Sequence, residues 1–320
     1  MGSSNNAVDI HDLTFTHILP GTRIPATPDP ALRNVNFSLP KGSRTLLIGG
    51  NGAGKSTLLT LLSGKRLIRE GKMTIFGRDV FRDLPQNVTY LGTEWAMNAR
   101  VRSDIVVSNF LDSVGGYRHK QRRDHLLNVL DVNLDWCAEN APIRMMDSDE
   151  THRHMHAISD GERRRVQLVM GLMGEWDLLL LDEVTVDLDV LVRSELLKFL
   201  AQESKTRNAT IIYATHIFDG LNEFPTHVAH MRDGAFVLNP TPWPLNPSLL
   251  PPESKMIKTG TLLHSVALMW LSEDRALRLR EEREGKRPAV RGARIQAVPT
   301  NSESFYKKRV AIPSLPLDVC

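Results

Sequence analysis

Cysteine and long apolar stretches are scarce in this chain, and each shortage excludes a class of protein. Only Cys137 and Cys320 occur among 320 residues, which is too few for a disulfide framework and favours a reducing compartment. No apolar run approaches the roughly 18 residues that a membrane-spanning helix needs. Residues 1–7 lack a secretion signal, and Asn6 stands where a myristoylation motif has Ser or Thr. We therefore expect a cytoplasmic protein with no membrane insertion.

Charge is unevenly distributed, although the formal net charge is only +3. Residues 275–309 carry eleven Lys and Arg against four Glu, so the rest of the chain is slightly acidic. Residues 288–320 are rich in Pro, Ser and basic side chains, which predicts a basic, disordered tail. Such a tail could bind nucleic acid through phosphate contacts, and a solvated tail is the alternative.

A glycine-rich loop between two apolar runs is the most informative motif. The loop reads Gly49, Gly50, Asn51, Gly52, Ala53, Gly54, Lys55, Ser56 and Thr57. The run before it, residues 45–48, predicts a buried strand, and residues 58–62 predict the first turns of a helix. In that context glycines let backbone N–H groups surround phosphate oxygens at a helix N-terminus. Lys55 would reach the β- and γ-phosphates and Ser56 would bind Mg²⁺, so the loop predicts an ATP site.

Two further strand ends carry side chains suited to phosphate chemistry. The apolar residues 178–181 lead into Asp182 and Glu183. A carboxylate at the carboxyl end of a strand lies where open α/β sheets bind their ligands. Asp182 would hold Mg²⁺ through water and Glu183 would polarise the attacking water. The alternative is a strand that merely ends in acidic surface residues. His216 follows the strand predicted at residues 209–214, where it could contact a γ-phosphate.

A second anion-ready turn lies upstream of the acidic strand end. Ser159 and Gly161 open a predicted helix, and Glu162 follows them. No segment of the same chain is an obvious partner for this turn. Asp189 follows Glu183 closely.

The order and spacing of these motifs resemble those of ABC-type ATPases, over about residues 8–240. The resemblance implies that Asp182 is a metal carboxylate, Glu183 the general base and His216 a γ-phosphate sensor. It also implies a homodimer on ATP binding. In that dimer Ser159, Gly161 and Glu162 reach the ATP of the second subunit, and Asp189 lines the interface.

Several positions depart from the usual pattern of that family. Asp160 stands where the signature has its first glycine, and Val184 where proline usually follows the glutamate. The loop that normally begins with a metal-sensing glutamine has Thr93 or Glu94 at that place. The aromatic residue that stacks on adenine falls near His17; either His17 takes that role or Phe15 packs in the core beside it.

With these departures, the chain resembles a small group of eukaryotic single-domain ABC ATPases that lie outside membranes. A fungal member is associated with the CCR–NOT complex, which implies a regulatory role in mRNA deadenylation and transcription, in the cytoplasm and also the nucleus. The alternative is the ATPase subunit of a membrane transporter with separate permease chains. A third class is a scaffold that holds ATP without turnover. The intact Lys55, Glu183 and His216 argue against it.

The predicted fold is α/β. It has an ABC-type P-loop core with a mainly parallel sheet, N-terminal antiparallel strands and an inserted helical subdomain. We expect the ATPase domain at residues 1–240, with the helical subdomain at about 95–176. A C-terminal extension follows at 241–287, and the tail at 288–320. The amphipathic stretch 261–286 predicts a helix that either docks on the body or contacts a partner. His152, His154 and His156 favour a solvated loop over a zinc site.

Overall fold

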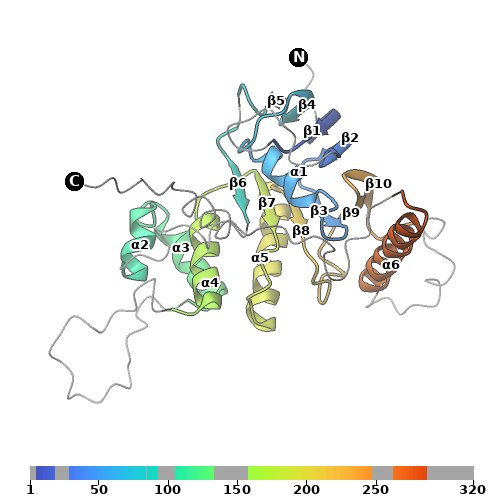
Figure 1. Cartoon of the computed structure of the whole chain (residues 1–320). Helices are drawn as coiled ribbons and strands as arrows, with labels where there is room; N and C mark the ends of the chain where they lie inside the picture. The colour runs from blue at the N-terminus through green and yellow to red at the C-terminus, as the bar shows by residue number, and fades with distance from the viewer. Residues whose placement is uncertain are drawn as a thin grey trace, which may run out of the picture. The chain divides into compact units, whose positions relative to one another are not determined.

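Two β-sheets form the centre of the protein. The computed structural model describes residues 5–18, 29–83, 85–92, 105–132, 158–246 and 262–286 (Figure 1). A four-stranded antiparallel sheet has the order β2-β1-β4-β5. Its strands are β1 (Asn6–Phe15), β2 (Leu32–Pro40), β4 (Glu70–Ile75) and β5 (Arg78–Asp79). The predicted N-terminal antiparallel strands are thereby confirmed.

The larger sheet has six strands in the order β10-β9-β3-β8-β7-β6. They are β3 (Arg44–Ile48), β6 (Val88–Leu91), β7 (Leu178–Asp182), β8 (Thr210–Ala214), β9 (His227–Arg232) and β10 (Ala235–Pro242). All neighbouring pairs are parallel except β9 and β10, so the predicted mainly parallel sheet is confirmed. Strands β9 and β10, which form a hairpin at one edge, were not predicted from the sequence.

Side chains of the central strands point alternately to the two faces of the large sheet, and each face has its own part of the core. Leu46, Leu181 and Tyr213 face one part with α4 (Asp160–Leu172) and α5 (Val190–Arg207). Leu47, Leu180 and Ile212 face the other part with α1 (Lys55–Leu62) and the antiparallel sheet. Because successive strand residues point to opposite faces, α1 and α4 lie on opposite faces of the same sheet (Figure 1).

The segment expected to be mostly helical around residues 103–135 contains two short helices. They are α2 (Val107–Ser113) and α3 (Lys120–Val129), and a turn with Gly115 and Gly116 separates them. Phe110, Leu111 and Leu126 join the same core as α4. These helices and α4 are the described part of the predicted helical subdomain.

The C-terminal helix α6 (Leu262–Arg283) crosses the boundary between two compact units, Met1–Asp274 and Arg275–Cys320. In the first unit Leu263, Val266 and Trp270 belong to the core, as expected of a docked helix. In the second unit the helix end is polar, and Arg280 pairs with Glu284 at 2.9 Å.

A buried histidine anchors the first half of α6. His230 on β9 is 2% exposed, its ring stacks on Trp270 with centroids 5.0 Å apart, and Nε2 lies 2.9 Å from Asp274 Oδ2. We expect Asp274→Ala to lower the free energy of unfolding by roughly 1–3 kcal/mol, because His230 loses its buried partner. Urea unfolding measures this, with the exposed Glu273→Ala beside it as control. Equal stability of the two variants would contradict the anchoring role.

Within the described ranges, no helix combines the length and the hydropathy needed to cross a membrane.

Candidate functional site

The glycine-rich loop joins β3 to α1 at the carboxyl edge of the large sheet. Gly54 caps the helix at φ +101°, and a Cβ there would lie 2.9 Å from the Ala31 carbonyl oxygen and 2.8 Å from Leu32 Cδ2. Only glycine fits such a position without strain. Lys55 begins the helix and is 6% exposed; its Nζ donates to the carbonyls of Gly49 at 2.6 Å and Gly50 at 3.1 Å. The ammonium is therefore held over the loop.

The β9–β10 hairpin supports this loop from beside it. Gly234 at the hairpin turn has φ +81°, and its N–H donates to the Ala53 carbonyl at 3.0 Å. A Cβ at Gly234 would lie 2.6 Å from the Ala31 carbonyl oxygen. This support was not predicted from the sequence, although Asp233-Gly234 is a typical hairpin signal.

Two carboxylates follow β7 beside the loop. Asp182 is 5% exposed, and its Oδ1 makes no hydrogen bond to any described residue, while Tyr90 donates a long 3.4 Å bond to Oδ2. A buried carboxylate oxygen without a donor is costly, unless a cation or water occupies the space beside it. The oxygen donor set of Ser56 and Asp182 suits Mg²⁺.

Glu183 has an unusual backbone. Its φ is +53°, a conformation that costs a non-glycine residue of order 1–3 kcal/mol and that clusters at functional sites. Its N–H donates to the Ala214 carbonyl at 3.0 Å. The His216 N–H donates to Glu183 Oε2 at 3.2 Å, and His216 Nε2 lies 3.1 Å from Oε1. The structure thus brings the ends of β7 and β8 together at one carboxylate.

Charges and burial act against each other among these groups. Burial raises the pKa of Glu183, and the nearby His216 and Lys55 partly offset that rise. Burial lowers the pKa of Lys55, and Glu183 and Asp182 oppose that change. Lys55 is therefore electrostatically coupled to both carboxylates.

Ser159, Gly161 and Glu162 form the signature turn, which caps α4, the signature helix. This helix lies on the opposite face of the sheet from α1. Ser159 Oγ accepts from the Glu162 N–H at 3.2 Å, and Glu162 Oε2 accepts from the Ser159 N–H at 2.8 Å. This reciprocal capping box fixes the helix start. A Cβ at Gly161 would lie 3.0 Å from the Asp187 carbonyl oxygen, so the turn touches the loop after Glu183.

Asp189 caps α5 and pairs with an arginine of the signature helix. Its Oδ1 accepts from the N–H groups of Leu191 and Val192 at 3.0 Å, and its Oδ2 lies 2.5 Å from Arg165 Nη2. The flanking Val190 and Leu191 are 83% and 79% exposed. This exposed apolar pair therefore lies next to an acidic residue whose position is fixed.

His17 lies against the start of α1. Arg66 donates to its Nδ1 at 2.9 Å, and its Nε2 lies 3.2 Å from Thr57 Oγ1. Because a guanidinium only donates, Nδ1 is the acceptor and Nε2 carries the proton. Burial and the Arg66 charge both lower the pKa of His17, which favours this neutral ring. Phe15 meets the ring edge-on, with centroids 5.1 Å apart, and packs partly against the core.

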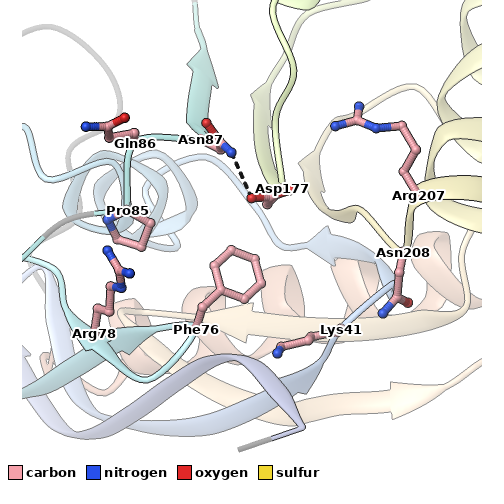
Figure 2. A pocket seen from close by; sticks show the side chains of 9 residues that line it. All are labelled: Lys41, Phe76, Arg78, Pro85, Gln86, Asn87, Asp177, Arg207 and Asn208. Carbon is pink, nitrogen blue, oxygen red and sulfur yellow. Dashed lines mark hydrogen bonds between the residues drawn. The ribbon is translucent and has the colours of Figure 1, made fainter. Parts of the chain in front are cut away.

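A separate hollow lies at the amino edge of the large sheet, opposite the edge that carries the P-loop. Its volume is about 490 Å³, and Figure 2 shows Lys41, Arg78 and Arg207 around it, with Asn87 hydrogen-bonded to Asp177 at 3.0 Å. Asn87 and Asp177 precede the amino ends of β6 and β7, whereas the P-loop and Glu183 follow carboxyl ends. This hollow is therefore not part of the site around Lys55.

Some predicted positions lie outside the described residues. They are Thr93 and Glu94, the three histidines at 152, 154 and 156, and the basic tail 288–320. Among the described residues, no cluster of three or more His, Cys, Asp and Glu could hold a metal ion.

Comparisons with known proteins identify the family. The sequence model of the family described as ABC transporter matches residues 32–186. The chain is 40% identical over 252 residues to CCR4-associated factor 16 of Saccharomyces cerevisiae, covering 74% of this chain and 79% of that protein. It is 39% identical over 245 residues to ABC transporter I family member 20 of Arabidopsis thaliana, covering 73% and 69%.

A solved structure has the same fold. It is the ATP-binding cassette MJ0796, a dimer in a post-hydrolysis state bound to ADP and Pi, with a TM-score of 0.56 and 17% identity. The match covers 75% of this chain and 100% of that chain. Taken with the site geometry, these similarities show that the chain belongs to the ABC transporter family and is an ABC ATPase, an enzyme that binds and hydrolyses ATP.

Proposed function

We propose that this ATPase hydrolyses ATP at two sites, each shared between two copies of the chain. The observation that carries the proposal is the position of α1 and α4 on opposite faces of one sheet. We therefore expect the P-loop and the signature turn of one chain to face different phosphates. A two-fold dimer solves this, because each signature turn of Ser159, Gly161 and Glu162 can face the P-loop of the other copy.

Within one chain, the P-loop amides and Lys55 bind the phosphates of ATP. Ser56 and Asp182 would hold Mg²⁺, which would supply positive charge against the phosphate oxygens. Glu183 accepts a proton from the attacking water, and His216 holds the carboxylate and faces the γ-phosphate. His17 lies beside Thr57, which suits a contact with the nucleotide base. Glu94 remains a proposed metal contact from its place in the sequence.

Asp189 and the exposed apolar residues beside it form the surface that meets the second copy. Val186, Val190 and Leu191 are 55%, 83% and 79% exposed in the single chain. A partner that covers them would remove this apolar surface from water, which favours association. Arg165 holds Asp189 in place for the contact.

The rate of hydrolysis should depend on pH through Glu183. The base works only when ionised, and burial raises its pKa, so kcat/KM should rise with pH through a point above the ordinary carboxyl range. Below that point Glu183 is protonated and turnover falls. Measuring kcat/KM between pH 5 and 9 at saturating Mg²⁺ tests this. An acid limb at the value of a free glutamate would contradict the burial argument.

The dimer's opening and closing regulates a partner complex. The name of the Saccharomyces cerevisiae relative, CCR4-associated factor 16, supports a partner of the CCR–NOT type, acting in mRNA deadenylation or transcription. Such a partner would place the protein in the cytoplasm and also the nucleus.

A transporter ATPase is the second candidate, favoured by the Arabidopsis thaliana relative, which is named an ABC transporter. Affinity purification of the tagged chain followed by mass spectrometry separates the two functions. Deadenylation factors in the eluate support the regulatory role. Membrane permeases in their place would support the transporter role and overturn the regulatory one.

A further inference from the structure

Among the residues that the structure describes, Arg164 is the most deeply buried cation that the proposed mechanism leaves without a role. It lies on α4, five residues after the cap Ser159, and is 6% exposed. Its guanidinium makes no ion pair with a carboxylate among the described contacts; it donates to backbone carbonyls instead. A buried cation is costly, so its hydrogen bonds must offset the loss of water.

Three carbonyls from two separate strand ends accept these bonds. Nε donates to Val184 at 3.1 Å, Nη2 to Glu183 at 3.0 Å, and Nη1 to Gly92 at 3.0 Å. Gln167, one turn further along α4, accepts from Nη1 and donates to the Gly92 carbonyl at 3.2 Å. Only the planar guanidinium, with five donors in a fixed fork, can reach such a set.

The contact with Glu183 matters because that residue has an unfavourable backbone. At φ +53° it persists only while its surroundings hold it. Ala214 fixes its N–H, Arg164 fixes its carbonyl, and His216 fixes its carboxylate. Without Arg164 the Glu183 carbonyl can swing about the N–Cα bond, so that φ moves toward an ordinary value. Such a rotation would turn the Cα–Cβ bond and carry the carboxylate away from its position beside Lys55.

We propose that Arg164 is a positioning residue of the ATPase, which holds the backbone of Glu183 and so aims its carboxylate, and which ties the signature helix to the same strand end. The proposal rests on the proposed role of Glu183 as the base. It also gives a route by which contact at Ser159 could reach the base of the same chain, since α4 joins the two within about one and a half turns.

The test is steady-state kinetics of the full chain with Arg164→Lys. The single ammonium keeps the charge but cannot hold three carbonyls. We expect kcat to fall about 10- to 100-fold, since small misplacement of a reacting group has effects of that size, while the Kd for Mg·ATP changes less than about threefold.

Arg44→Lys is the matched control. Arg44 is 8% exposed, and its Nε donates to the Phe224 carbonyl at 2.7 Å, at the start of β3 and far from the P-loop end. The Arg44→Lys protein should lose about as much thermal stability as Arg164→Lys and keep the kcat of the native chain. If both variants lose kcat equally, the role of Arg164 is only structural and the proposal is overturned. If Arg164→Lys does not fold, Gln167→Met, which leaves Arg164 in place but removes the side chain that links it to the Gly92 carbonyl, should lower kcat by roughly three- to tenfold. No loss of kcat there would overturn the proposal.

A double variant separates this inference from the proposed function. Glu183→Gln alone must abolish most turnover; if it does not, the base assignment fails, whatever Arg164 does. If it does, adding Arg164→Lys should change the residual single-turnover rate by less than about twofold, because Arg164 acts through Glu183. A further loss equal to that in the native background would overturn the positioning role while leaving the base assignment intact.

Discussion

Glu183→Gln is expected to lower ATP turnover by about 10²–10⁴-fold, the range that a general base contributes. Glutamine keeps the size of the side chain and can still accept the His216 N–H bond at Oε1, but it cannot take a proton from water. Removing the negative charge lowers the repulsion that the phosphates meet, so Mg·ATP should bind at least as tightly. Phosphate release under steady-state conditions measures the loss.

Glu195→Gln serves as the control for this substitution. Glu195 is an exposed residue of α5 that pairs with Lys198, at 2.7 Å. Its turnover should equal that of the native chain. Native-like turnover in Glu183→Gln would show that another group activates the water, and the strained backbone of Glu183 would then need a different explanation.

Lys55→Ala should weaken ATP binding by at least about 100-fold. The ammonium is buried and already aimed along the loop, and hydrogen bonds to charged groups contribute roughly 1.5–3 kcal/mol each. Alanine removes the cation and leaves the loop carbonyls of Gly49 and Gly50 without their donor. Titration calorimetry with Mg·ATP measures the affinity.

Lys41→Ala provides the comparison, because Lys41 lies at the opposite edge of the large sheet beside the separate hollow (Figure 2). Its affinity for Mg·ATP should match that of the native chain. Equal, modest losses in the two variants would mean that general positive charge, and not the placement of Lys55, attracts the nucleotide.

The fold was largely predictable because its central strands are continuous apolar runs. Residues 178–181 are all leucine, and residues 210–214 are all buried and uncharged, which is typical of parallel strands covered on both faces. The β9 strand was missed for the opposite reason: His227, His230 and Arg232 interrupt its pattern. Only the packing of His230 against Trp270 and Asp274 shows why a histidine can be buried there.

The candidate site was predictable where local order along the chain determines it. Lys55 must follow the P-loop glycines, and Asp182 and Glu183 must follow their strand. Arg164 was missed because its role depends on carbonyls at Gly92 and Val184, which are distant in sequence. One signal was available: Arg164 stands four residues before the buried Leu168 and eight before the buried Leu172, so helical spacing places it on the apolar face.

The shared site is tested most directly by the mass of the Glu183→Gln protein in solution. Size-exclusion chromatography with light scattering should give twice the chain's 36.0 kDa with Mg·ATP and a single-chain mass with ADP, as ligand-linked association requires. Adding Ser159→Arg should abolish the shift, since its side chain would fill the space facing the partner's P-loop. A Glu183→Gln protein that binds Mg·ATP at saturation yet keeps the mass of one chain at micromolar concentration would contradict the shared-site account.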